Sequence, residues 1–208
     1  MNQNGGVNGQ EQDQPNQISV RDCETTSTSP SRRLILNRVW AMPNRYPFII
    51  PPIAALVARY VSDGKGWIDP FAGMYSPAEI TNDLNPKAKA QYHLDALDFL
   101  KGLKGQYQGI LFDPPYSYHQ MQECYEEIGI GKITSRHATN FYGDLRDAIA
   151  PLIVPGGLAL SFGWNSIGMG KTHGFEIIEI LLVCHGRAHN DTICTVERKI
   201  QGNLREGW

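Results

Sequence analysis

The sequence has no long apolar run, little cysteine and almost no excess charge. It contains no stretch of about 18 apolar residues, so we expect no membrane-spanning helix and no membrane partner. Its polar start, MNQNGGVNGQEQDQPNQ, lacks the basic and apolar parts of a secretory signal. The four cysteines are therefore expected to stay reduced in a cytoplasmic protein. Hydrophobic residues make up 41% and charged residues 19%, which excludes collagen-like, coiled-coil and wholly disordered chains.

Residues 1–31 differ in composition from the rest of the chain. They are rich in Asn, Gln, Gly, Ser and Thr, so we expect a disordered tail. Four acids and one base give this tail a net charge of −3: Glu11, Asp13, Asp22, Glu24 and Arg21. The chain total of −2 leaves +1 for residues 32–208, which we expect to form one domain. A nearly neutral domain binds nucleic acid only through local patches.

Short apolar runs at regular spacing predict an α/β fold. Seven runs have the composition of strands: 66–71, 79–83, 91–96, 109–115, 156–163, 175–186 and 191–199. Helices are expected between them and before them: 51–61, 96–104, 117–128 and 141–152. Strands that alternate with helices favour a mostly parallel sheet, and the short polar turn between the last two strands favours an antiparallel hairpin. Residues 72–78 fit poorly, because a parallel crossover normally needs a longer connection.

Three acidic residues, Asp69, Asp83 and Asp95, each lie at the end of one of three successive predicted strands. Asp69 begins a glycine loop, Asp69–Gly73, where backbone can approach a ligand or simply turn. Asp83 can accept hydrogen bonds from ribose hydroxyls or cap a helix. Asp95 can accept from an adenine amino group or cap the helix at 96–104. Because the ends of parallel strands meet at one edge, we expect these acids to lie close together.

The sharpest motif is Asp113-Pro114-Pro115-Tyr116, which follows the apolar run ILF. The two prolines stiffen the backbone and remove two N–H donors, so carbonyl groups there can face a ligand. Asp113 adds an acceptor and Tyr116 adds an aromatic face. This combination suits a planar group with an exocyclic amine; the alternative is a rigid loop with Tyr116 in the core.

These motifs resemble those of S-adenosylmethionine-dependent amino-methyltransferases of DNA, in particular small adenine-N6 enzymes of phage type. The resemblance covers roughly residues 34–200. Asp69–Gly73 matches the family's cofactor motif, and Asp113–Tyr116 matches its catalytic motif, [DNS]-P-P-[YFW]. Asp83 and Asp95 match the positions that bind the ribose and the adenine of the cofactor.

The resemblance implies a Rossmann-like methyltransferase fold, S-adenosylmethionine as cofactor and DNA as partner, either a duplex with a flipped adenine or a single strand. A homodimer is left open, and no metal is expected. Trp40-Ala41 with Arg45-Tyr46-Pro47 matches a further cofactor motif. The implied catalytic residues are Asp113, Pro114, Pro115 and Tyr116. The implied cofactor-binding residues are Trp40, Asp69, Pro70, Phe71, Ala72, Gly73, Asp83, Leu84, Asp95 and Ala96.

The implied reaction is methyl transfer to adenine N6, whose lone pair is delocalised into the ring. Hydrogen bonds from N6 to Asp113 and to the Pro114 carbonyl would stabilise the positive charge that develops on the nitrogen. Tyr116 would stack on a base taken out of the helix. None of the four cysteines follows a proline, which disfavours a cytosine-C5 enzyme.

The sequence departs from larger family members, because it leaves no room for a separate DNA-recognition domain. The spare segment is 117–140, which holds residues able to touch bases or phosphates or to form a solvated helix and loop: Ser117, Tyr118, His119, Gln120, Lys132, Arg136, His137 and Asn140. Trp164-Asn165-Ser166 can line the substrate cleft or belong to the core. A zinc site from Cys184, His185, His189 and Cys194 is disfavoured because no C-x-x-C pair is present.

Other activities share these motifs. RNA guanine-N2, protein-glutamine and cytosine-N4 methyltransferases use similar signatures, although the leading Asp disfavours the glutamine enzymes and cytosine-N4 enzymes more often show Ser. A catalytically inactive methyltransferase fold that binds nucleic acid as a scaffold is the non-enzymatic alternative. Intact cofactor and catalytic motifs argue against the scaffold.

Overall fold

The computed structural model of the chain describes residues 33–129, 131, 135–186 and 189–200, without the side chains of 135–139. The predicted disordered tail at residues 1–31 lies outside this range. The described strands are β1 (Ile35–Trp40), β2 (Trp67–Asp69), β3 (Ile80–Thr81), β4 (Tyr107–Phe112), β5 (Ile153–Gly163), β6 (Phe175–Cys184) and β7 (Thr192–Lys199). The described α-helices are α1 (Pro51–Val61), α2 (Ala96–Gly102), α3 (Tyr118–Glu127) and α4 (Ser135–Ile149). Short 3₁₀ turns lie at Pro47–Ile49, Ala150–Leu152 and Lys171–His173.

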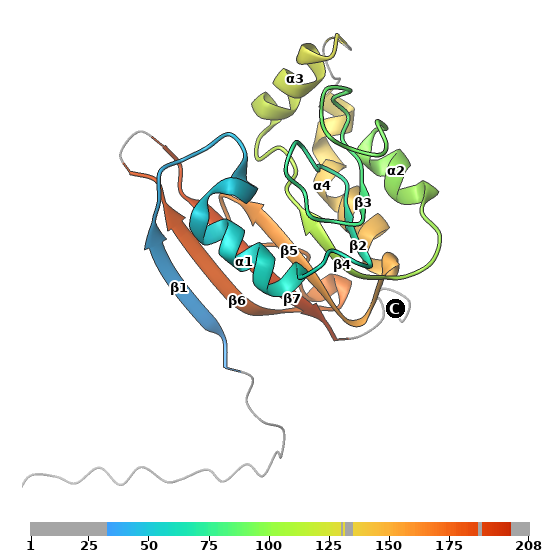
Figure 1. The fold of residues 1–208 in the computed structure, drawn as a ribbon. Helices are drawn as coiled ribbons and strands as arrows, with labels where there is room; N and C mark the ends of the chain where they lie inside the picture. The colour runs from blue at the N-terminus through green and yellow to red at the C-terminus, as the bar shows by residue number, and fades with distance from the viewer. Residues whose placement is uncertain (1–32, 130, 132–134, 187–188, 201–208) are drawn as a thin grey trace, which may run out of the picture. The chain divides into compact units, whose positions relative to one another are not determined.

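The strands form one sheet in the order β1-β6-β7-β5-β4-β2-β3 (Figure 1). Strand β7 runs antiparallel to both β5 and β6, whereas the other neighbours are parallel. The α/β class, the mostly parallel sheet and the C-terminal antiparallel hairpin are therefore confirmed.

One predicted strand is wrong, and one strand of the sheet was not predicted. Residues 91–96 form no strand; only a single bridge pairs Tyr92 with Asn82. The seventh strand is instead β1, which pairs with β6 at the far edge of the sheet. Five of its six residues are exposed, and Asn37 and Arg38 interrupt its apolar residues. An exposed edge strand lacks the clear alternation that identifies half-buried strands.

The predicted helices are present, with one boundary displaced. Helix α1 begins at Pro51, where the missing N–H of proline costs no hydrogen bond. Helix α4 begins at Ser135, six residues before the predicted start, because its first turns carry few apolar residues that would signal a helix. The connection between β2 and β3 contains no helix. It can be this short because β2 and β3 pair over only two residues each.

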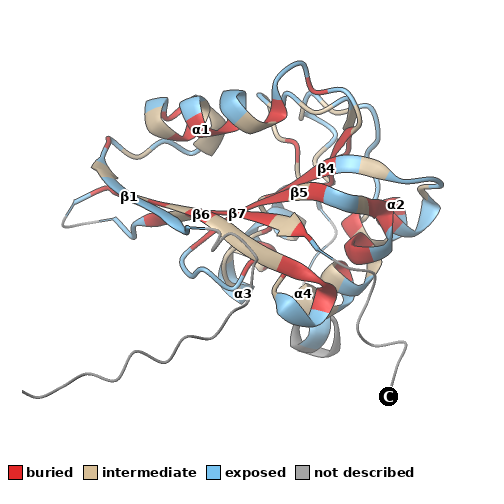
Figure 2. Cartoon of the chain, turned by 90° about the horizontal axis from the view of Figure 1, so that it is seen from below, coloured by how far each residue is buried: buried red, intermediate tan, exposed pale blue. Residues whose placement is uncertain are grey.

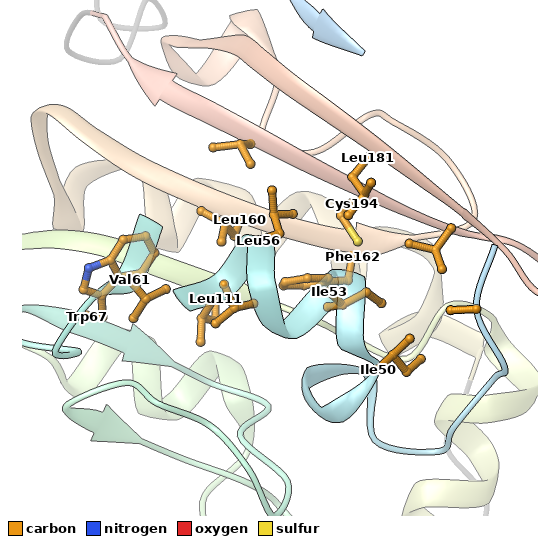
Figure 3. Packing of buried hydrophobic residues seen from close by; sticks show 14 residues of the cluster. Ile50, Ile53, Leu56, Val61, Trp67, Leu111, Leu160, Phe162, Leu181 and Cys194 are labelled. Carbon is orange, nitrogen blue, oxygen red and sulfur yellow. The ribbon is translucent and has the colours of Figure 1, made fainter. Parts of the chain in front are cut away.

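Hydrophobic clusters cover both faces of the sheet (Figure 2). On one face, Ile53 and Leu56 of α1 pack against Leu111, Leu160 and other strand residues (Figure 3). On the other face, α2 and α4 supply a second cluster: Phe99, Leu100, Leu145 and Ile149. This packing fixes the strand ends from which the site is built. Among the described residues, no helix is long and apolar enough to cross a membrane.

Candidate active site

A pocket of about 970 Å³ opens at the carboxyl ends of β2, β3 and β4. This is the edge of an open α/β sheet where ligands commonly bind. The structure brings most of the predicted site residues to its wall: Pro70, Phe71, Ala72, Gly73, Asp83, Leu84, Asp95, Ala96, Asp113, Pro114, Pro115 and Tyr116. Trp40 and Asp69 do not line it.

Gly73 and Asp83 join the loops that follow β2 and β3. The Gly73 N–H donates to one Asp83 carboxylate oxygen at 2.8 Å, and the Asn85 N–H donates to the other at 2.8 Å. Gly73 has φ +54°, and a Cβ built on it would meet no atom within 4 Å. The glycine is therefore required by its backbone conformation, and it leaves open space in which a ligand can approach the main chain.

Asp69 lies beneath this loop and is fully buried. Its carboxylate accepts hydrogen bonds from the Phe71 N–H at 2.9 Å and from the Ser76 hydroxyl at 2.6 Å. Burial raises the pKa of Asp69 to about 7, against the opposing effect of these two hydrogen bonds. The residue thus shapes the glycine loop from below, and its side chain does not face the pocket.

Asn82 is a structural centre of the site that sequence reasoning did not single out. Its buried side chain donates to the carbonyls of Pro70 and Leu94 at 3.2 and 3.0 Å, and it accepts from the Leu94 N–H at 2.9 Å. It therefore holds together two loops that line the pocket. The signal available in the sequence was an amide residue at the end of a strand, directly before Asp83.

Asp95 was expected either to bind an adenine amino group or to cap a helix, and in the structure it caps α2. One of its carboxylate oxygens accepts from the Leu97 N–H at 2.9 Å and so caps α2. The other accepts from the Tyr125 hydroxyl at 2.8 Å, which connects α2 to α3. Asp95 still lines the pocket, so capping and ligand contact are compatible.

The Asp113–Tyr116 loop forms the wall at the end of β4. The Tyr116 hydroxyl donates to Asp113 at 2.6 Å, and the Tyr116 N–H donates to the Gln120 side chain at 2.7 Å. Burial raises the pKa of Asp113 to about 6, against the lowering effect of the Tyr116 hydrogen bond. Burial and the Asp113 charge raise the pKa of Tyr116 well above its ordinary value. Tyr116 therefore stays a neutral donor that orients the Asp113 carboxylate.

The Pro114 carbonyl accepts no hydrogen bond from any residue that the structure describes. Its neighbour Pro115, by contrast, accepts one from the Tyr142 hydroxyl. The site thus presents one carboxylate and one unpaired carbonyl on a rigid backbone. Two acceptors of this kind can bind the two N–H groups of an exocyclic amine.

The N-terminal motif is only partly at the site. Arg45, Tyr46 and Pro47 line the pocket, and Tyr46 packs edge-on against Tyr75 at 5.2 Å between ring centroids. Trp40, at the end of β1, is 65% exposed and lies apart from the pocket lining.

Helix α3 forms a further wall through Gln120, Met121 and Tyr125. It occupies the first part of the spare segment, and Ser117 caps its N-terminus by accepting from the Gln120 N–H at 3.2 Å. Sequence reasoning did not anticipate that this helix closes the pocket. Lys132 and the side chains of Arg136 and His137 lie outside the described residues.

Acidic side chains dominate the charged part of the pocket wall. Five acids face two bases there: Asp83, Asp95, Asp113, Glu123 and Glu127 against Arg45 and Lys87. Such a wall favours a ligand that carries positive charge. Within the described range, no three His, Cys, Asp or Glu side chains gather closely enough to hold a metal ion. Cys184 and Cys194 are buried, and Cys194 belongs to the core on the α1 face.

The comparisons with known proteins show the fold. No protein-family model and no curated protein matches the sequence. TrmN from Thermus thermophilus is similar in structure over 75% of this chain, with 16% identity and a TM-score of 0.51. This chain covers 50% of TrmN and therefore spans about half its length.

Two further solved structures match less well. One is the 1,6-didemethyltoxoflavin-N1-methyltransferase of Burkholderia thailandensis, solved with bound 1,6-didemethyltoxoflavin and S-adenosylhomocysteine. It is 12% identical, the match covers 72% of this chain and 77% of that chain, and the TM-score is 0.49. The other is the N-methyltransferase NodS of Bradyrhizobium japonicum. It is 12% identical, the match covers 71% of this chain and 85% of NodS, and the TM-score is 0.45. The strand order and the antiparallel β7 are those of the Rossmann-like methyltransferase fold. The chain has the fold of S-adenosylmethionine-dependent methyltransferases.

Proposed function

We propose that the protein transfers a methyl group from S-adenosylmethionine to the N6 amino group of adenine in DNA. The proposal rests on two hydrogen-bond acceptors in the same loop: the Asp113 carboxylate and the Pro114 carbonyl, which accepts no hydrogen bond from any described residue. Both groups line the pocket that Gly73 and Asp83 also line. A binding site for the cofactor and an acceptor pair for an amine therefore meet in one cavity.

The residues of the candidate active-site pocket fit the cofactor. The pocket volume of about 970 Å³ lies at the upper end of the range for small-molecule sites, which suits a nucleoside with an amino-acid chain. Gly73 leaves room for close approach, and Asp83 offers carboxylate oxygens to ribose hydroxyls. The acidic wall complements the sulfonium and ammonium charges. When bound, the cofactor supplies an electrophilic methyl group.

The chain's own residues then act on the acceptor amine. Asp113 and the Pro114 carbonyl accept the two N6 hydrogens, which positions the nitrogen and stabilises the positive charge that develops on it. Tyr116 keeps one Asp113 oxygen fixed at 2.6 Å and leaves the other for the amine. The nitrogen forms its bond to the methyl group as the methyl–sulfur bond of the cofactor breaks, which gives S-adenosylhomocysteine. The extra proton on N6 then passes to solvent, because Asp113 is a weak base with a pKa of about 6.

DNA remains the proposed substrate on the basis of the Asp113–Tyr116 motif, and two basic side chains at the pocket rim are compatible with it. Adenine N6 cannot reach a pocket wall while the base is stacked in a duplex, so the substrate is a flipped base or a single strand. Arg45 and Lys87 are exposed at the rim and can contact phosphates. With only two such bases in the lining, we expect loose or short sequence specificity.

Two substitutions separate the acceptor site from the cofactor site. Asp113→Ala should abolish methylation and leave cofactor affinity nearly unchanged, because Asp113 is assigned to the amine. Asp83→Ala should weaken cofactor binding first, because Asp83 is assigned to the ribose. Isothermal titration with S-adenosylhomocysteine measures the affinity, and transfer of a tritiated methyl group to DNA measures the reaction.

The modified nucleoside identifies the substrate directly. DNA and RNA are each incubated with the protein and S-adenosylmethionine, digested to nucleosides and analysed by mass spectrometry. We expect N6-methyladenine from DNA. N4-methylcytosine, or a methylated nucleoside from RNA alone, would replace the proposed acceptor, and retained activity in Asp113→Ala would overturn its role.

A further inference from the structure

Exposed apolar side chains gather at β1, the strand at one edge of the sheet (Figure 1). Within residues 34–42, five large apolar side chains are between 45% and 69% exposed: Leu34, Ile35, Leu36, Trp40 and Met42. Figure 2 shows the strand mostly in the colour of exposed residues. Single exposed apolar residues are ordinary on a protein surface, whereas a group of them marks an interaction site.

One face of β1 is not covered by any described helix. Asn37 donates to Glu179 at 3.3 Å, a residue that α1 also contacts through Arg59. Val39 packs against the hydrophobic cluster under α1. Because side chains alternate along a strand, three others lie on the opposite face: Leu36, Arg38 and Trp40. Within the described residues, the cluster under α2 and α4 contains no residue of β1, and the connection between β5 and β6 contains a 3₁₀ turn but no α-helix.

The backbone edge of β1 is also open. Among the residues that the structure describes, β1 pairs with β6 alone, in a regular register over all six of its residues. Natural edge strands are usually protected from further pairing by charges, prolines or bulges. β1 has one charge, Arg38, and neither a proline nor a register shift. The N–H and C=O groups of its outer edge therefore present a template for a further strand.

A second copy of the chain fits this edge best. Residues 1–31 and 201–208 contain few large apolar side chains to place against the exposed ones. A second copy carries the same edge and the same apolar residues, and a net charge of only −2 gives little repulsion between copies. The exposed area of the five side chains is on the order of 600 Å² per copy, which reaches the lower end of the range for specific interfaces.

We propose that two copies associate through β1, antiparallel about a two-fold axis, to form one continuous sheet. Residues that face each other in an antiparallel pair lie on the same side of the sheet, so the axis passes beside a residue that faces itself in the other copy. An axis beside Arg38 would place two guanidinium groups directly opposite, which is destabilising. With the axis beside Asn37, Leu36 of each copy instead faces Arg38 of the other, and Ile35 faces Val39. The register is therefore centred on Asn37.

Leu36 tests this register because it faces Arg38 of the other copy. Sedimentation velocity of the full chain, from low micromolar to the highest soluble concentration, should show a reversible dimer. Leu36→Lys should weaken dimerisation at least about tenfold, because two like-charged pairs replace two apolar contacts. Leu36→Glu should stay within about threefold of the wild type, because its carboxylate pairs with the arginine. Leu36 is 69% exposed, so neither variant disturbs the folded monomer. Ile167→Lys, at a 60% exposed position in the connection after β5, is the control and should dimerise like the wild type.

A cysteine crosslink checks the same register independently. With the axis beside Asn37, Asn37→Cys places two thiols directly opposite each other, at a Cβ separation of about 5 Å that a disulfide can span after a small adjustment. Arg38→Cys places its two thiols on a diagonal of about 7–8 Å, so it should crosslink much less under the same mild oxidation. The wild type, with the exposed thiol of Cys124, gives the background.

The outcomes do not depend on the proposed methyl transfer, because neither cofactor nor DNA is present. A monomer at every concentration overturns the proposal, and slow amide exchange of residues 35–40 in that monomer would show that another segment of the chain occupies the edge. A dimer that Leu36→Lys and Leu36→Glu affect equally, or that Arg38→Cys crosslinks more readily than Asn37→Cys, overturns the β1 register. A dimer with the expected charge pattern stands even if no methylated nucleoside forms.

Discussion

Three aspartates follow strands at one edge of the sheet, and hydrogen bonding gives them different roles. Asp69 is buried under the glycine loop and bonded to Phe71 and Ser76. Asp83 joins two loops and faces the candidate active-site pocket. Asp113 is held by Tyr116 beside an unpaired carbonyl. Their positions in the sequence predicted that they would converge, but only the three-dimensional contacts show which of them can touch a ligand.

Methyl transfer should fall as the pH drops through about 6. Burial raises the pKa of Asp113 to about 6, so the carboxylate is charged only above that pH. The protonated group has lost acceptor capacity and no longer stabilises positive charge on the amine. The measurement is kcat between pH 5 and 8 at saturating cofactor and DNA.

The pKa of Asp69, about 7, is close to that of Asp113, so Asp69→Asn is the control. Its profile should keep the fall near pH 6, because Asp113 is unchanged. A flat profile in the wild type, or loss of the pH 6 limb in Asp69→Asn, would contradict the assignment to Asp113.

Asp69→Asn should stabilise the protein at pH 8 relative to the wild type. Because burial raises the folded-state pKa of Asp69 to about 7, its contribution to stability is fully present below about pH 4 and is lost as the pH rises through 7. Each pKa unit corresponds to about 1.4 kcal/mol, so the loss is on the order of a few kcal/mol. An amide can still accept from the Phe71 N–H and can donate to Ser76.

Thermal melts at pH 5 and pH 8 test this expectation. The difference in Tm between Asp69→Asn and the wild type should grow towards pH 8 in favour of the variant. Asp63→Asn changes a carboxylate with 64% side-chain exposure and should show no such growth. A variant that is less stable than the wild type at both pH values would show that the charged form is needed for folding.

At the scale of elements, the site depends on short strands and on the loops that follow them. Strand β3 has only two residues, and the chain near Tyr92 adds a single bridge to Asn82. Side-chain hydrogen bonds therefore hold these segments together, whereas other sheets use longer strand pairing for this purpose. Asn82 is the clearest case, because its buried amide connects the loops at Pro70 and Leu94.

Asn82→Ala should lower the free energy of unfolding by about 3 kcal/mol. The substitution removes the partner of the buried Pro70 carbonyl and the partners of the Leu94 N–H and carbonyl, which are only partly buried. A buried backbone group without a partner costs about 1–3 kcal/mol. Urea unfolding measures the loss, and calorimetry should also show weaker cofactor binding because both loops line the pocket. Asn85→Ala is the control: the Asn85 side chain accepts from the Lys87 N–H at an exposed turn, so little change in stability is expected. Equal effects in the two variants would remove the special role of Asn82.

The sequence predicted elements where burial leaves a periodic signal. Strands β4 to β7 and helix α1 were found because their apolar residues face the two cores. Strand β1 was missed because it is an exposed edge, and residues 91–96 were assigned wrongly because side-chain bonds from Asn82 hold them without a ladder. In the site, the acids and the proline loop could be named from motifs. The wall formed by α3 depends on packing between distant segments, for which a single sequence carries no signal.

At the scale of the whole molecule, the fold is shared with proteins whose sequences are very different. Identity to TrmN is 16%, yet the strand order is that of the methyltransferase fold. Both faces of the sheet carry a hydrophobic cluster, a condition that many different sequences can satisfy. Fold alone does not determine activity, so binding of the cofactor by the intact protein is the decisive property.

S-adenosylmethionine should raise the melting temperature of the full chain. A ligand that binds only the folded state at 100 times its Kd adds about 2.7 kcal/mol, which corresponds to roughly 5–10 °C for a chain of this size. The shift should shrink in Asp83→Ala, which weakens the ribose site, and should persist in Asp113→Ala, which changes the acceptor site. No shift at millimolar cofactor would refute the assignment of the candidate active-site pocket. A full shift without any methylated nucleoside would instead identify a cofactor-binding scaffold, because the pocket would then be intact while the acceptor site fails to act on DNA.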